Sequence, residues 1–346
     1  MEGSWEADSV LPDEGGREGF TFYSSPLYCY YPRPVAQFLS PMLSISRILW
    51  PTDLSQGAEA AFPYAATLAD WHDAELHVLH ARGAAPASEQ EFPLAPDTLA
   101  GAVERAGPPS RTVDLDDLAL RQVASPEDAP GDAIVSYAEQ KEIDLVVMGT
   151  RERRGLQRLL IGSVTEEVLR TAPCPVLTVR GGEDQSSAWD VSTILAPVDF
   201  SEASLQAVRH TRELALTYGA RITLLHAIEE VMYPSAYGLE MADAPGPEVI
   251  DRVEDSLAEL AREEIGYEHV VVDSTVGYAP SRILDYVEAN DVDLIVIATH
   301  GRSGLERLLL GSVTERVVRR ASVPVFVVKS FGKSLLPGSD GTSNGG

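Results

Sequence analysis

An internal repeat is the feature that most constrains how this chain can fold. The segment GLQRLLIGSVTEEVLRTAPCPVLTV at residues 155–179 returns as GLERLLLGSVTERVVRRASVPVFVV at residues 304–328. Three further blocks recur in the same order: ILWPTDLS (48–55) as ILAPVDFS (194–201), AELHVLHA (74–81) as ARITLLHA (220–227), and EIDLVVMGT (142–150) as DVDLIVIAT (291–299). Because every block appears twice in one order, the chain is predicted to hold two copies of one domain.

The repeat also sets the predicted domain boundaries. The copies span 42–180 and 191–330, joined by the polar, glycine-bearing linker 181–190. Residues 1–41 are acidic and then rich in tyrosine and proline without a period, so they are either a disordered tail or an upstream extension that precedes a true start at Met42. Residues 331–346 are rich in glycine and serine and are predicted to be a disordered tail.

Each copy alternates strand and helix patterns. In the second copy, strands are expected at 192–198, 221–228, 269–276, 292–299 and 323–328. Helices are expected at 202–218 after the cap Ser201, at 246–265, from Pro280 to about 291, and from Ser312 onward. Alternating strands and helices predict two tandem Rossmann-like, doubly wound, five-stranded parallel-sheet domains, since right-handed crossovers cover both faces of such a sheet.

The charge balance excludes one class of partner. The net charge is −26, and the positive charges other than Lys141, Lys329 and Lys333 are all arginines. An acidic field disfavours binding to a nucleic-acid backbone, so no nucleic-acid partner is expected. Strong acidity with few lysines favours a protein adapted to a salty cytoplasm, and an ordinary acidic surface is the alternative.

Cysteine usage and hydropathy bear on the compartment. Cys29 and Cys174 are far apart, which does not predict a disulfide framework, and Cys174 lies in an apolar run typical of a small buried residue. No apolar run reaches the length of a membrane span, and the N-terminus is acidic where a signal peptide would be basic. We therefore expect a cytoplasmic protein without a membrane partner.

Ligands of doubly wound sheets bind outside the carboxyl ends of the strands, at the point where the strand order reverses. Three stretches of each copy converge there: the turn after the first strand, with Asp53 or Asp199; the end of the second strand, at Ala81 or Ala227; and the loop after the fourth strand, from Met148 or Ile297. A carboxylate there can accept hydrogen bonds from ribose hydroxyls, and small residues leave room for a flat ring. The alternative is that each aspartate caps a helix, although Ser55 and Ser201 are placed to cap those helices themselves.

The fourth-strand loop ends in GSVT, at 162–165 and at 311–314. Glycine followed by free amides at a helix N-terminus is typical of a phosphate site, although the same letters can simply start a helix. The loops also gather cationic side chains, which either attend that anion or form a solvated face: Arg151, Arg153, Arg154 and Arg158 in the first copy, and His300, Arg302 and Arg307 in the second.

With these motifs, the chain resembles two tandem copies of the universal stress protein domain, over residues 42–330. Nucleotide-binding members of that family carry a glycine, two residues, a second glycine, nine residues, then glycine and serine or threonine. The first copy reads Gly149, Glu152, Gly162, Ser163, and the second reads Ala298, Gly301, Gly311, Ser312, so each departs once from the pattern. A side chain at 152 opposes any positive φ and brings a carboxylate toward the phosphates, whereas the methyl group of Ala298 is a smaller change. The second site is therefore predicted to be the better preserved.

The resemblance implies an adenine nucleotide site in each copy, of the type found in adenine nucleotide alpha hydrolase-like folds, with ATP or a related nucleotide as ligand, with or without Mg²⁺. The implied residues of the first site are Pro51, Thr52, Asp53, Ala81, Met148, Gly149, Arg151, Gly162, Ser163, Val164 and Thr165. Those of the second are Pro197, Val198, Asp199, Ala227, Ile297, Ala298, His300, Gly301, Arg302, Gly311, Ser312, Val313 and Thr314.

Family members also pair through their last strands, so the resemblance implies that the two copies form an internal dimer about a pseudo-twofold axis; a further dimer of tandem chains stays open. The implied function is a regulatory stress-response module controlled by nucleotide occupancy. One alternative is an enzyme such as a slow ATPase, against which the GxxxxGK[ST] phosphate loop, paired carboxylates and any protein metal site are missing from the sequence. A second alternative is a scaffold with decayed sites that acts through protein contacts.

Overall fold

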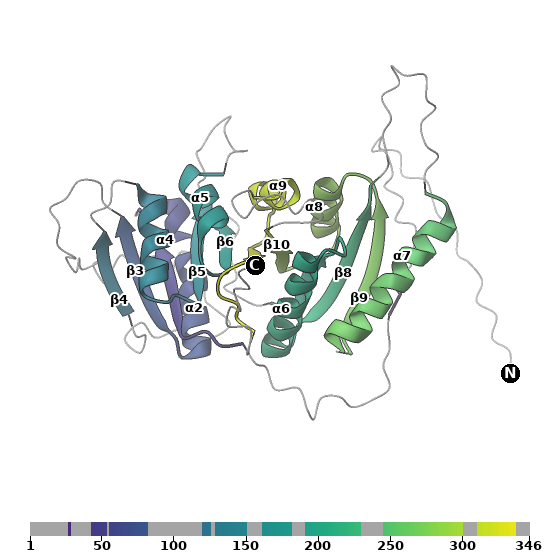
Figure 1. Ribbon diagram of the computed structural model, residues 1–346, viewed down its shortest axis with the longest axis horizontal. Helices are drawn as coiled ribbons and strands as arrows, with labels where there is room; N and C mark the ends of the chain where they lie inside the picture. The colour runs from purple at the N-terminus through teal and green to yellow at the C-terminus, as the bar shows by residue number, and fades with distance from the viewer. Residues whose placement is uncertain are drawn as a thin grey trace, which may run out of the picture.

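The computed structural model describes residues 27–28, 43–53, 55–81, 120–125, 129–150, 161–181, 191–229, 245–266, 268–299 and 310–336. Two α/β halves lie side by side and share one continuous sheet (Figure 1). The strand order in this sheet is β1-β9-β8-β7-β10-β11-β6-β5-β2-β3-β4. Each half contributes five parallel strands, which confirms the predicted pair of doubly wound domains.

The elements of the first half alternate along the chain as the patterns predict. They are β2 (Arg47–Pro51), α1 (Gln56–Glu59), α2 (Phe62–His72), β3 (Glu75–Ala81), β4 (Leu120–Ser125), α4 (Pro130–Gln140), β5 (Leu145–Thr150), α5 (Ser163–Thr171) and β6 (Val176–Arg180).

The second half repeats this order, with one long helix, α6, where the first half has α1 and α2. Its elements are β7 (Thr193–Pro197), α6 (Glu202–Tyr218), β8 (Arg221–Ile228), α7 (Pro247–Leu260), the π-helical turn η3 (Ala261–Ile265), β9 (Val270–Val276), α8 (Ala279–Ala289), β10 (Leu294–Ala298), α9 (Ser312–Arg320) and β11 (Val325–Val328).

Polar anchors fix where the first strand of each half begins. The Asp144 carboxylate accepts hydrogen bonds of 2.8 Å from the backbone amides of Ser46 and Arg47. In the second half Asp293 does the same for Ser192 and Thr193, each at 2.9 Å. Asp144 immediately precedes β5, and Asp293 immediately precedes β10. The hydrogen bonds therefore connect β5 to β2 and β10 to β7, the neighbouring strands between which the strand order reverses in each half.

The two halves join through their last strands, as the resemblance implied. β6 and β11 run antiparallel, with Leu177 opposite Phe326. This pairing, called the junction below, covers the edge that each half would otherwise expose. Because β6 and β11 are antiparallel, the carboxyl ends of the parallel strands of one half point in the opposite direction to those of the other half.

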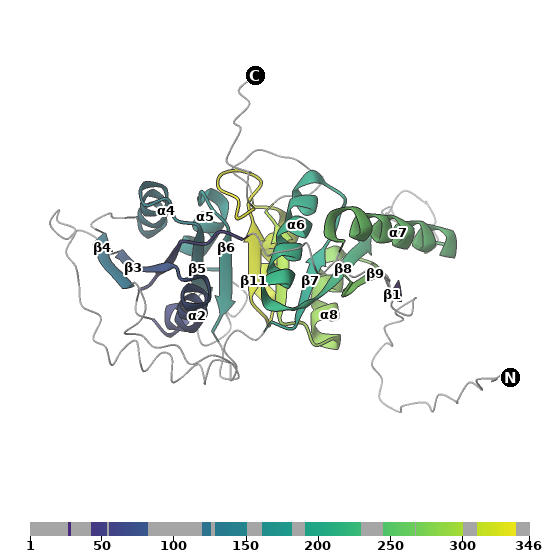
Figure 2. The same cartoon turned by 90° about the horizontal axis from the view of Figure 1, so that it is seen from below.

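Helices cover both faces of the sheet, as Figure 2 shows for α6 and α7 on one face of the second half and α8 on the other. Two buried clusters follow from this arrangement. One joins α2 to α6 and α7, and the other joins α4 and α5 to α8 and α9. Both clusters run across the junction, so the halves share their cores as well as their sheet.

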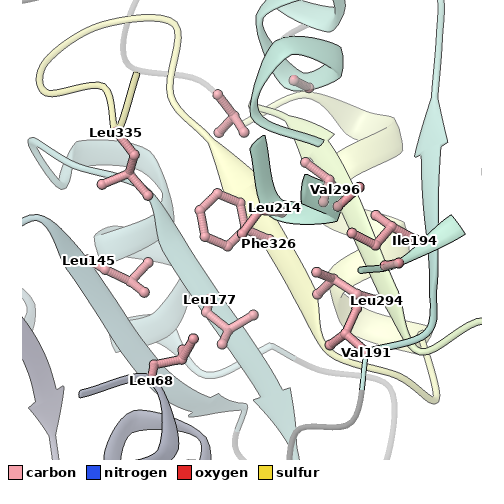
Figure 3. Close-up of a cluster of buried hydrophobic side chains, with 14 of the residues drawn as sticks. Leu68, Leu145, Leu177, Val191, Ile194, Leu214, Leu294, Val296, Phe326 and Leu335 are labelled. Carbon is pink, nitrogen blue, oxygen red and sulfur yellow. The ribbon is translucent and has the colours of Figure 1, made fainter. Parts of the chain in front are cut away.

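The shared core is concentrated around Phe326 of β11 (Figure 3). Phe326 and Leu177 are no more than 1 % exposed and belong to the same cluster as Leu214 of α6 and Leu68 of α2. Burial of large aliphatic and aromatic side chains contributes about 1.5–3 kcal/mol each, so the two halves are expected to unfold together.

A short strand, β1 (Leu27–Tyr28), adds to the outer edge of the second half. It pairs antiparallel with β9, Leu27 opposite Val272. The sequence analysis expected no element in residues 1–41. The rest of that segment lies outside the described residues, as do residues 182–190 of the predicted linker.

The segment after β11 packs where the sequence analysis expected a disordered tail from residue 331. Leu335 is 1 % exposed and belongs to the core around Phe326. The Ser44 amide donates to the Leu335 carbonyl at 3.3 Å, and the Lys333 amide donates to the Pro173 carbonyl at 2.6 Å. Glycine and serine dominated the interpretation of this segment, and the apolar Leu335 among them was missed. Residues 337–346 lie outside the described residues.

Two further expectations concern membranes and cysteine. Among the described residues, no helix has both the length and the apolar character that crossing a bilayer requires. Cys174 is a free thiol and fully buried, as its apolar surroundings predicted.

Candidate functional site

Each half has a cavity at the carboxyl ends of its central strands, next to the reversal of strand order between β2 and β5 or between β7 and β10. The second-half cavity has a volume of about 420 Å³, and the first-half cavity about 280 Å³. Small-molecule sites in proteins usually measure about 300–1,000 Å³, so only the second-half cavity falls within that range.

The second-half cavity brings together all the predicted residues of that half that the structure describes. They come from the ends of three strands and the first turn of α9: Pro197, Val198, Asp199, Ala227, Ile297, Ala298, Gly311, Ser312, Val313 and Thr314. His300, Gly301 and Arg302, together with Arg307, lie outside the described residues.

Asp199 lies in the turn between β7 and α6. Its carboxylate accepts hydrogen bonds from the Ser201 amide at 3.0 Å and from the Ser201 hydroxyl at 2.6 Å. Ser201 itself caps α6 by accepting from the Ser204 amide at 3.2 Å. Ser201, and not Asp199, is therefore the helix cap, in line with the placement of Ser201 in the sequence. The Asp199 side chain is half-buried and lines the cavity.

The backbone next to Asp199 is unusual. Phe200 has a φ of 61°, a left-handed conformation that costs a non-glycine residue about 1 kcal/mol or more. The Phe200 ring packs 5.1 Å from the ring of His226. Strained backbone of this kind is concentrated at ligand sites, which supports the cavity as the site of function.

His226 is a cavity residue that the sequence analysis did not select. Its Nδ1 lies 2.6 Å from the Val198 carbonyl oxygen, and because a carbonyl only accepts, Nδ1 carries the proton. The same bond occurs in the first half between His80 and the Thr52 carbonyl at 2.8 Å. The signal was present in the sequence, since both repeats read LHA, but the histidine was passed over for the small residue after it.

The residue after the second strand, β8, and the start of α8 also contribute to the cavity, and neither was predicted from the sequence. Glu229 and Ala279 line the second-half cavity, and the Ala279 amide donates to the Glu229 carboxylate at 3.3 Å. Ile283 of α8 adds an apolar wall. The site predicted from the sequence comprised three strand ends and left out the start of α8.

The turn at the start of α9 presents free backbone donors. Gly311 precedes the helix, and no side chain caps it. The first amides of a helix lack internal partners and carry the positive end of the helix dipole, so they suit an anion. The Thr314 hydroxyl donates to the Ala298 carbonyl at 2.6 Å and is 3 % exposed, so Thr314 anchors this turn to β10.

The first-half cavity contains all of its predicted residues whose side chains the structure describes. It is lined by Pro51, Thr52, Asp53, Met148, Gly149, Gly162, Ser163, Val164 and Thr165. Ala81 ends β3, but its side chain lies outside the described part of the chain, as do Arg151, Glu152, Arg153, Arg154 and Arg158. Asp53 accepts from the Ser55 amide at 3.0 Å, and Ser55 caps α1.

The helix that follows the first strand makes the first-half cavity smaller. Gly57 and Ala58 of α1 line this cavity, whereas the corresponding helix of the second half contributes only Ser204. A Cβ placed on Gly149 would lie 1.7 Å from the Gly57 carbonyl oxygen. This close approach needs glycine at 149, and the second half has Ala298 at that position. The two cavities therefore differ in shape as well as in volume.

A family model described as universal stress protein family matches residues 44–180 and 191–329. The chain belongs to the universal stress protein family. Within this family, universal stress protein Rv2623 of Mycobacterium tuberculosis is 28 % identical over 301 residues, which cover 80 % of this chain and 94 % of that protein.

Other universal stress proteins match over shorter stretches. A universal stress protein of Mycolicibacterium smegmatis is 32 % identical over 195 residues, 55 % of this chain and 63 % of that protein. The match to this relative thus spans less than two thirds of its length. Among solved structures, a universal stress protein from Archaeoglobus fulgidus aligns with 82 % of this chain and 98 % of its own, with a TM-score of 0.55 at 19 % identity. That similarity concerns the fold.

Proposed function

We propose that this tandem universal stress protein binds an adenine nucleotide, such as ATP, in the second-half cavity, and that occupancy of this cavity regulates the protein. The observation that carries the proposal is the composition of one cavity of about 420 Å³, in which a carboxylate, an apolar wall and an uncapped helix N-terminus meet. Ribose hydroxyls, a purine ring and a phosphate are the three chemical groups that such a cavity suits.

Each part of the nucleotide has a proposed partner. The Asp199 carboxylate accepts from the ribose hydroxyls or the adenine amine, and Ile283 with Ala227 provides an apolar surface for the ring. The amides of Ser312 and Val313 donate to the phosphates. Asp199 and Glu229 are both acidic, so the phosphates are expected to lie on the α9 side of the cavity.

The described residues offer no protein cage for a metal. No group of three histidine, cysteine, aspartate or glutamate side chains in the part of the chain that the structure describes could hold a metal ion. Mg²⁺ is usually held by one or two carboxylates together with substrate phosphates. In this proposal, any Mg²⁺ therefore enters with the nucleotide, with Asp199 or Glu229 as the carboxylates in reach of the cavity.

The first-half cavity takes part differently. At about 280 Å³, and with the α1 backbone lining it, it is too small for the same ligand pose. We propose one adenine nucleotide per chain, held in the second half. A cytoplasmic location is part of the same proposal, since nucleotide concentrations there are high enough for occupancy to follow the state of the cell.

Calorimetric titration of the full chain with ATP tests the assignment. Asp199→Ala is expected to weaken binding about tenfold or more, because a lost hydrogen bond to a charged group costs about 1.5–3 kcal/mol. Asp53→Ala changes the matching aspartate of the first half and is the control, with affinity expected to match the wild type. Equal affinity of wild type and Asp199→Ala would overturn the assignment, and a full loss with Asp53→Ala would move the site to the first half.

A further inference from the structure

Two cationic side chains cross the junction in opposite directions. Lys329 follows β11 directly and is 4 % exposed. Its ammonium group donates to the carbonyl oxygen of Leu169 and lies 3.5 Å from that of Val168. Both carbonyls belong to the last turns of α5, a helix of the first half, whereas Lys329 belongs to the second half.

The reciprocal contact is made by Arg180, the last residue of β6. Its Nη1 donates to the carbonyl oxygen of Arg320 at 3.2 Å, and Arg320 is the last residue of α9. Arg180 and Lys329 hold matching places in the repeat, each one residue past a run of four apolar or threonine residues, VLTV or VFVV. A basic side chain therefore contacts the C-terminal part of the opposite helix once in each direction across the pseudo-twofold axis, at the last residue of α9 and at Leu169, two residues before the end of α5.

The helices that these cations contact are the helices that line the two cavities. α5 begins after Gly162 and α9 begins after Gly311, and the turn at Gly311 is the one proposed to receive the phosphates. Carbonyls at a helix C-terminus lack internal partners and carry the negative end of the dipole, so a cation there stabilises the helix. Each helix has only nine residues, and helix formation is cooperative, so holding its C-terminal end lowers the cost of ordering its N-terminal end.

A short chain of hydrogen bonds connects Lys329 to the second-half cavity. The Gly311 amide donates to the Thr299 carbonyl at 2.8 Å, and the Thr299 amide donates to the Val328 carbonyl at 3.0 Å. Val328 is the residue before Lys329. The turn that lines the second-half cavity is thus three hydrogen-bonded steps from the C-terminus of α5 in the first half.

The surroundings of Lys329 are otherwise apolar. Its ammonium nitrogen lies 5.2 Å from the centre of the Phe331 ring. The Cys174 thiol is the titratable group whose charge acts on the pKa of Lys329. Burial lowers the pKa of Lys329 to about 7, and both protonation states of the amine donate hydrogen bonds to carbonyl oxygens. The contact to α5 thus persists on either side of neutral pH.

We propose that Arg180 and Lys329 are positioning residues, each of which holds the cavity-lining helix of the opposite half, so that the two cavities are completed and coupled across the junction. The ligand part of this inference rests on the proposed function: a phosphate group at the start of α9 is favoured by Arg180. The helix part of the inference, that each side chain stabilises a helix of the opposite half, does not depend on any ligand.

Amide hydrogen exchange of the full chain tests the helix part. At about pH 6, where Lys329 is protonated, Arg180→Met is expected to speed exchange in α9, and Lys329→Met in α5, each by between about twofold and thirtyfold, the range for a cation at a helix C-terminus. Each substitution thus acts on the half to which it does not belong. Arg180→Lys is expected to restore slow exchange in α9, because it returns a cation.

Lys333→Met is the matched control. Lys333 also connects the second half to the first, through the Glu142 carbonyl at 3.0 Å and an ion pair with Asp144, but it does not contact α5. Its substitution is expected to leave exchange in α5 and α9 at the wild-type rate. Equal acceleration of both helices by Arg180→Met, or unchanged exchange in α9, would overturn the inference.

Calorimetry with ATP separates this inference from the proposed function. Arg180→Met is expected to weaken ATP binding by the same factor by which it speeds exchange in α9, and Arg180→Lys to restore it. If the wild type does not bind ATP, the proposed function fails while the crossed exchange pattern still supports the positioning role. If the wild type binds ATP and Arg180→Met changes neither affinity nor exchange, the positioning role fails while the function stands.

Discussion

The indole nitrogen of Trp50 donates a hydrogen bond of 2.9 Å to the backbone carbonyl of Ala58. Trp50 is 1 % exposed in β2, and its ring packs 4.7 Å from the ring of Phe62. The matching residue of the second half is Ala196, which has no donor to offer. This one difference accompanies the break between α1 and α2 in the first half, where the second half has the single helix α6.

The break in the first half changes the cavity beside it. α1 ends at Glu59, and its Gly57 carbonyl lies against Gly149, in space that the cavity of the second half keeps open. The two halves thus share a fold but differ where a ligand would bind. This asymmetry is the physical basis for proposing one nucleotide per chain.

Gly149→Ala is expected to lower the free energy of unfolding by about 1–3 kcal/mol, because the new methyl group would overlap the Gly57 carbonyl and force α1 to move. Urea unfolding measures this. Gly181→Ala is the control, since its nearest contact would be at 3.4 Å and within ordinary packing distance. Equal stability of Gly149→Ala and wild type would show that α1 does not lie against Gly149 in solution.

The buried Lys329 predicts a pH dependence of stability. Burial lowers its pKa from 10.5 to about 7 in the folded chain, so the unfolded chain binds more protons between these values and stability rises with pH from about 7 upward. The rise is expected to reach up to about 2 kcal/mol by pH 9. Urea midpoints at pH 6, 7, 8 and 9 measure it, and Lys329→Met is expected to remove it.

Two other buried groups limit the pH range in which the effect of Lys329 on stability can be measured. Burial raises the pKa of Cys174 from 9.0 to about 12 and that of Tyr286 from 10.0 to about 12. The unfolded chain loses these protons first, so both groups lower stability above about pH 9. A rise between pH 7 and pH 9 that persists in Lys329→Met would contradict the assignment to Lys329.

An aromatic contact between α2 and α6 makes a separate prediction. The Trp71 and Tyr218 rings stack with centres 4.5 Å apart, and His72 Nε2 lies 3.1 Å from the Tyr218 hydroxyl. Tyr218→Phe is expected to cost about 0.5–1.5 kcal/mol of unfolding free energy, the usual contribution of one hydrogen bond. Tyr278→Phe is the control, because it removes a hydroxyl whose hydrogen bond from Arg316 lies exposed to solvent and is expected to contribute little to stability.

His72, which belongs to the same contact, makes the stability of the protein depend on pH in the acid range. Burial lowers its pKa below 6.5 in the folded chain, so the unfolded chain binds the proton first and stability falls as the pH drops below about 6.5. His210 is lowered for the same reason and adds to the fall. His72→Gln is therefore expected to reduce, and not to abolish, the loss of stability between pH 6.5 and pH 5, measured by thermal unfolding.

The repeated blocks of sequence were sufficient to predict the fold, and the resemblance to the universal stress protein family predicted the junction. Strands of continuous apolar residues and capped helices predict a doubly wound sheet, and Ser201 and Gly219 mark the ends of α6 where the structure has them. The predicted residues of the second half that the structure describes gather in one cavity because parallel strands end at one edge.

What the sequence could not give depends on contacts between distant residues. Trp50 and Ala58 are eight positions apart, but the effect of their bond on the cavity depends on Gly149 in another strand. The contacts of Arg180 and Lys329 need the junction geometry, which brings the end of each last strand to a helix of the other half. Leu335 was missed because its partners, Phe326 among them, lie in a core that only the assembled halves form.

Native mass spectrometry of the full chain, purified without added nucleotide and then titrated with ATP, tests the central claim most directly. The account predicts one adenine nucleotide per chain, retained in Asp53→Ala and bound about tenfold or more weakly in Asp199→Ala. A chain that stays empty at millimolar ATP would contradict the account, and so would a wild type that takes up two nucleotides with equal affinity.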